Sequence, residues 1–170
     1  MPNHLSVLGI IHTAISVVAL IVALAALFRD GKINPANGTG KLYILLTVLT
    51  CLTSLPIMKT GHLTAGHYVA VVILVLLPIG FYARRLFGKA ANYIQVIVMS
   101  TTLFLSFIPA IVETLTRLPI SKPLADGPND PIIQKALSAL ILLYIVGVVY
   151  QLFKLWTKRR LDQTAAAKFS

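Results

Sequence analysis

Residues 5–28 read LSVLGIIHTAISVVALIVALAALF, an apolar run without an acidic or basic side chain other than one histidine. A helix that rises about 1.5 Å per residue needs roughly 20 such residues to cross the ~30 Å hydrocarbon core of a bilayer. The run therefore predicts a membrane span. Four further apolar runs of similar character follow at 41–58, 64–83, 93–112 and 132–153.

The composition is that of a membrane protein. Hydrophobic residues make up 57% of the chain and charged residues 12%, about half the charged fraction of a soluble domain. Backbone amides that face lipid must be paired within their own segment, so the spans are expected to be helical. Five spans in 170 residues can form only one bundle. The predicted fold is an all-α, polytopic membrane helical bundle, with residues 1–170 in a single domain.

The distribution of cations predicts an orientation. Read as five spans, the chain places eleven of its 15 Lys and Arg residues on one side, in the first connection, the third connection and the C-terminal tail. Positively charged connections favour the cytoplasm. The N-terminus is therefore predicted outside and the C-terminus in the cytoplasm.

A net charge of +10 in a soluble protein would suggest nucleic acid. Here the cations flank spans, where the insertion rule and anionic lipid head groups account for them, and no nucleic-acid partner is expected. The Lys-Arg-Arg run at 158–160 is interpreted as a cytoplasmic anchor. Aromatic residues near predicted span ends suit an interfacial belt; they are Tyr68, Tyr82, Tyr93 and Trp156.

Two spans carry stripes at helical spacing. Small residues in lipid allow helices to approach closely, and polar residues on an apolar helix should face protein or a wet cavity. The first span has Gly9, His12, Ser16, Ala19, Ala23 and Ala26. The fourth has Gln95, Met99, Thr102, Ser106, Pro109, Glu113 and Arg117. Both stripes are predicted to face the bundle interior. The only cysteine, Cys51, lies in mid-span and is interpreted as a packing residue.

Chemistry is predicted in the outer half of the bundle. His12 lies about 10 Å below the outer end of its span, and His67 and Glu113 lie near the outer ends of theirs. An acidic residue in a span is a functional candidate, although Arg117, four residues on, would also pair with Glu113 at the interface. His62 precedes the third span.

Several ligands fit these residues. His12 and His67 would serve as axial ligands of haem b, or a His–Glu pair would bind a quinone head group or relay protons. His12, His62, His67 and Glu113 would supply ligands for a divalent metal such as zinc. Ordinary hydrogen-bonded interfacial histidines are the remaining interpretation, and the sequence does not decide among them.

Residues 40–56 and 61–78 resemble a group of small bacterial inner-membrane proteins that share a domain of unknown function. His12, Gly40 and Tyr43 match that group's pattern of a His in the first span and a Gly-x-x-Tyr entering the second. Ala36 and Asn37 stand where the group has His-Arg. The resemblance implies an inner-membrane helical bundle and no particular activity.

The leading interpretation is a non-enzymatic accessory or subunit-type membrane protein with a polar outer-half pocket. A redox protein that binds haem or quinone is the first alternative, and a metal-handling or transport protein is the second. The bilayer is the expected partner, together with other membrane subunits or further copies of the chain. The Pro-rich segment 116–131 is expected to form a structured cap or a mobile lid on the outer face.

Overall fold

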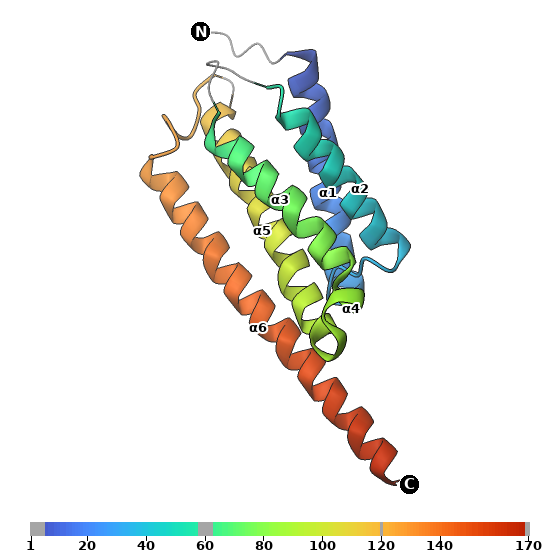
Figure 1. Cartoon of the computed structure of the whole chain (residues 1–170). Helices are drawn as coiled ribbons and strands as arrows, with labels where there is room; N and C mark the ends of the chain where they lie inside the picture. Colours follow the sequence, from blue (N-terminus) through green and yellow to red (C-terminus); the bar gives the residue numbers. More distant parts are fainter. Residues whose placement is uncertain (1–5, 58–62, 120, 169–170) are drawn as a thin grey trace.

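The computed structural model of the chain describes residues 6–57, 63–119 and 121–168, and all regular structure within them is helical (Figure 1). The elements are α1 (Val7–Asp30), α2 (Gly38–Ser54), α3 (Ala65–Phe81), α4 (Ala83–Leu86), the 3-10 helix η1 (Gly88–Ala90), α5 (Ala91–Arg117) and α6 (Pro131–Lys168). The five long helices correspond to the five apolar runs.

Local signals set the helix ends. The hydroxyl of Ser6 accepts a hydrogen bond from the Gly9 amide at the start of α1, and Gly31 ends that helix with a φ of 70°, a conformation that suits glycine. Helix α2 begins at Gly38, three residues before its apolar run, because the Asn37 side chain accepts from the Gly40 amide at 2.8 Å. It ends at Ser54, two residues before Pro56.

Three helical stretches are long and apolar enough to cross a membrane: Val7–Asp30, Gly88–Arg117 and Pro131–Thr164. Helices α2 and α3 have 17 residues each. At about 1.5 Å per residue they reach roughly 25 Å, the lower end of what a span needs. The helical membrane-protein character is therefore confirmed for three helices.

The core lies between α1, α2, α3 and α5. Helix α1 packs along α2, α2 also contacts α3, and α3 packs on α5. The expected stripe on α1 is confirmed, because Gly9, Ala19, Ala23 and Ala26 are its buried residues. A hydrogen bond of 3.0 Å joins the buried hydroxyls of Tyr43 and Thr102 and so ties α2 to α5.

Helix α6 is attached differently. Among the described elements it contacts only α5, through bonds of 2.9 Å from Ser100 to Gln151 and 2.8 Å between Thr101 and Tyr144. No residue of its most apolar 18-residue window is buried. Figure 1 shows α6 beside the bundle, with its C-terminal part extending past the other helices.

The described part of segment 118–130 folds back on α5. The amide of Ala125, a buried residue, donates to the carbonyl of Leu115 at 3.0 Å. The carboxylate of Asp130 accepts from the Ile132 amide at 2.9 Å at the start of α6. These bonds agree with the structured cap, one of the two forms expected for this segment.

Candidate functional site: a basic cavity at one end of the bundle

His12 joins two helices. Its Nδ1 lies 3.0 Å from the carbonyl oxygen of Thr50 and 3.1 Å from the hydroxyl of Thr53, both on α2. A ring N–H that donates to the Thr50 carbonyl gives an interhelical bond of the kind that stabilises helix pairs in lipid. This bond occupies Nδ1, so any ligand would have to bind through the other ring nitrogen.

His67 caps its own helix. Its Nδ1 accepts hydrogen bonds from the Thr64 backbone amide at 3.0 Å and lies 2.9 Å from the Thr64 hydroxyl. Because Nδ1 accepts from an amide, the proton of the neutral ring must be on Nε2. That nitrogen is buried and has no hydrogen-bond partner in the described part of the chain. The ring therefore keeps one unused donor.

Glu113 and Arg117 form an ion pair one turn apart on α5, the structural alternative expected for them. The Glu113 side chain is 53% exposed.

The three predicted residues do not form one compact cluster in the described structure. No group of three or more His, Cys, Asp or Glu side chains within those residues is arranged to hold a metal ion. Helices α1 and α3, which carry His12 and His67, make no mutual contact in the described elements. His62 lies outside the described residues. The haem, quinone and metal assignments stay predictions.

A different site lies at the opposite end, where α1 and α3 end and α5 begins; we call this the basic end. A cavity of about 550 Å³ opens there between the α1–α2 connection, the α3–α5 corner and α6. We call it the basic cavity. Its cationic lining residues are Lys32, Arg84, Lys89, Lys154, Lys158 and Arg159, and the remainder are Asp30, Gly31, Asn92, Tyr93, Val96, Gln151, Leu155 and Asp162.

Local structure brings these cations together. The left-handed Gly31 turns the chain directly after α1 and so directs Lys32 to the basic end. The short helices α4 and η1 hold Arg84 and Lys89 at the corner before α5. Lys154 and Lys158 are four residues apart on α6, so they lie on one face of that helix.

The cavity has unbalanced positive charge. The Asp30 carboxylate already accepts from Arg29 at 2.9 Å and from Asn37 at 2.8 Å, which leaves little of it for the cavity. Within the described residues none of the six cations forms an ion pair with a carboxylate. Burial lowers the pKa of Lys32, and the charges of Arg84 and Lys158 lower it further. Like charges therefore face one another across the cavity.

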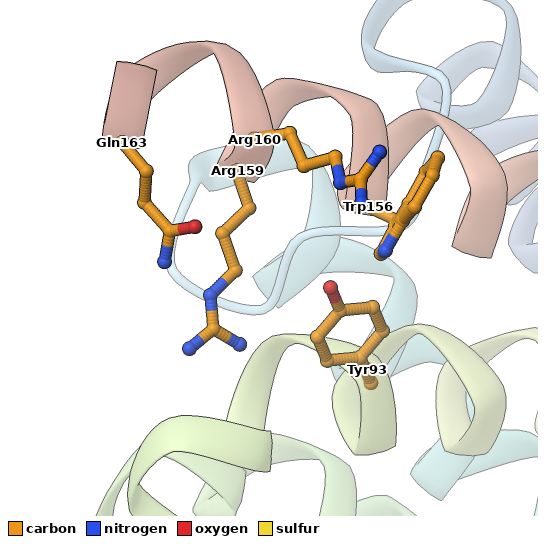
Figure 2. Close-up of a pocket in the computed structure, with 5 residues that line it drawn as sticks. All are labelled: Tyr93, Trp156, Arg159, Arg160 and Gln163. Carbon is orange, nitrogen blue, oxygen red and sulfur yellow. The ribbon is translucent and has the colours of Figure 1, made fainter. Parts of the chain in front are cut away.

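A second, smaller pocket of about 230 Å³ adjoins the basic cavity and shares Tyr93 and Arg159 with it. Figure 2 shows Tyr93 on α5 facing α6, with Trp156 and the two arginines opposite. The Arg160 guanidinium lies 4.4 Å from the centre of the Trp156 ring, which is a cation–π contact. Aromatic and basic side chains thus continue the site along α6.

Such a site can bind an anion, because several ammonium and guanidinium groups converge on one water-accessible space. The sequence alone did not predict the basic cavity, because each group of cations was interpreted as flanking its own span. One signal was present: the predicted topology already brought the first connection, the third connection and the tail to one side. The sequence did not predict the corner formed by α4 and η1, nor the face of α6 that packs on α5.

Comparison of this chain with protein families, with curated proteins and with solved structures gave no match. The functional interpretation of the basic cavity therefore depends on its geometry alone.

Proposed function

We propose that this protein is a non-enzymatic, accessory or subunit-type integral membrane protein that binds an anionic, phosphate-bearing group in its basic cavity. The proposal includes five spans, with the N-terminus outside and the basic end in the cytoplasm of a bacterial cell. The three long apolar helices support a membrane location. The 17-residue helices α2 and α3 are apolar and just long enough to cross.

The observation that carries the proposal is the composition of the cavity wall. Six cations from four separate segments line one space, and only two carboxylates accompany them. A surface that merely flanks spans needs cations near the membrane, but it does not need them to converge. Their mutual repulsion raises the free energy of the empty cavity, and a bound anion would relieve it.

Lysine reactivity tests the proposal. The protein in an uncharged detergent would be treated with limiting acetic anhydride, alone and with inorganic pyrophosphate or with cardiolipin, a phospholipid that bears two phosphates. We expect at least one of the two probes to slow acetylation of Lys32 and Lys158. Lys135, at the other end of α6, is the matched control and should react at the same rate throughout.

The proposal would be refuted if neither probe protected these lysines, or if Lys135 were protected equally. Equal protection would mean that the probes bind any exposed cation.

A second candidate function, quinone binding at the outer half, has one observation in its favour. The Nε2 donor of His67 is buried without a partner among the described residues, and a quinone carbonyl would accept from it. Absorption spectra of the purified protein, oxidised and dithionite-reduced, would show quinone or haem directly. A featureless spectrum in both states would count against this candidate.

A further inference from the structure

The ligand class follows from where the basic cavity lies, on the premise of the proposed function. Tyr93 lines the cavity, and Trp156 lies in the adjoining pocket. Tyrosine and tryptophan gather at the depth of the lipid head groups. The cavity is therefore level with the phosphates of the surrounding membrane leaflet.

The wall of the cavity combines two kinds of surface. Val96 and Leu155 supply apolar surface beside the polar Gln151, while the ammonium and guanidinium groups surround the remainder. A free inorganic anion gains no favourable contact from an apolar wall. A lipid, which has a phosphate attached to glycerol and acyl chains, matches both parts.

Helix α6 is in direct reach of the lipid acyl chains that surround the bundle. Beyond the cavity, toward its N-terminus, it exposes a series of large apolar side chains that no other described element covers. They include Leu142, Leu143, Val146, Val149, Tyr150 and Phe153, each more than half exposed. At 3.6 residues per turn, Leu142, Val146, Val149 and Phe153 lie on the side of α6 opposite Gln151, which lines the cavity and bonds to α5, so they face the surrounding lipid.

The charge of the cavity indicates the number of phosphates. Six cations face two carboxylates, of which Asp30 is already engaged by Arg29 and Asn37. One phosphodiester, with a single negative charge, would leave most of this excess uncompensated. Two phosphates compensate it better.

We propose that the basic cavity binds the head group of an anionic phospholipid that carries two phosphates, with Lys32, Arg84 and Lys158 as its principal contacts. The acyl chains extend from the cavity into the surrounding lipid. The site holds a specific lipid of the same membrane, in addition to the lipids that surround the bundle.

The test compares lipid binding by native mass spectrometry in detergent with added cardiolipin, with phosphatidylglycerol (one phosphate) and with zwitterionic phosphatidylcholine. We expect cardiolipin to bind most tightly. In Lys32→Gln/Lys158→Gln its affinity should fall roughly thirty-fold, since each cation near the surface contributes about 1 kcal/mol. The control Lys122→Gln/Lys135→Gln removes two cations away from the basic end and should bind as the wild type does.

A charge-conserving variant separates loss of binding from loss of folding. Lys32→Arg/Lys158→Arg should retain tight cardiolipin binding. No variant should melt at a lower temperature than the wild type when the exposure of Cys51 to a thiol-reactive dye is followed. Equal affinity of the Gln double variant and the wild type would overturn the inference.

Competition with inorganic pyrophosphate distinguishes the two sources of phosphate. If pyrophosphate binds as tightly as cardiolipin and displaces it, the site recognises a free anion, so the lipid inference fails while the proposed function stands. If neither binds, both fail.

Discussion

Replacing Gly40 with alanine should destabilise the protein, because the first turn of α2 has no room for a side chain at this position. A Cβ placed on Gly40 would lie 1.9 Å from the carbonyl oxygen of Asn34 and 2.4 Å from its carbonyl carbon. Real Cβ atoms essentially never approach within 3.0 Å of another atom, so two backbone segments would have to separate. Overpacking of this kind costs about 1–3 kcal/mol.

The separation would also disturb a cap. The Gly40 amide donates to the Asn37 side chain at 2.8 Å, and the loss of an N-cap costs about 1 kcal/mol. Together these effects predict a loss of roughly 2–4 kcal/mol in the free energy of unfolding. At about 2–4 °C per kcal/mol for a chain of this size, Tm should fall by at least about 4 °C.

Cys51 serves as the probe of unfolding, and Gly38 provides a matched control position. Cys51 is the single cysteine and is buried, so a thiol-reactive fluorophore reports unfolding without added labels. Gly38, two residues earlier, has no atom within 4 Å of the position that a Cβ would occupy, and Gly38→Ala should melt at the wild-type temperature or slightly above it. If Gly40→Ala and Gly38→Ala melted together, the close approach of Gly40 to Asn34 would be wrong.

Three further outcomes are expected. Lys32→Gln should stabilise the unliganded protein by about 0.5 kcal/mol by removing a like-charge contact. Because the folded-state pKa of Lys32 is lowered, the charged lysine destabilises the folded protein below that pKa, and this destabilisation is relieved as pH rises through it. The wild type and the variant should therefore converge in Tm at alkaline pH. His12→Leu should cost about 1 kcal/mol in the Cys51 melting assay, and Thr53→Val should cost less, since the carbonyl of Thr50 still accepts from the ring; equal losses would contradict this. A reporter fused after Ser170 should be cytoplasmic and a cysteine at Gly127 should react with an impermeant reagent from outside; the reverse pattern would reject the orientation.

The long helices could be predicted from the sequence because their apolar runs are strong signals. Their ends were less legible. The sequence did not show that Asn37 would cap α2 three residues early, and the apolar signal of α6 fades at Phe153 although its helix continues to Lys168. Charged residues weaken a span signal but form helix readily in water.

The packing faces were partly legible. The small residues of α1 are buried as expected, because their spacing alone defines a face that a second helix can approach. The sequence did not show which helix packs against each face. Which helices become neighbours decides that Tyr43 meets Thr102 and that Ser100 meets Gln151. Apolar segments resemble one another too closely for their neighbours to be predicted from the sequence.

The peripheral attachment of α6 has a consequence for the order of assembly. None of the ten residues of the main buried cluster comes from α6, so the four preceding long helices can complete their core while the last helix is still being synthesised. The final helix would then dock from the lipid, through hydrogen bonds to α5, as a late and reversible step. Since α6 contributes Lys154, Lys158 and Arg159 to the basic cavity, the complete charge cluster would exist only in fully assembled molecules, and lipid occupancy would mark the end of biogenesis.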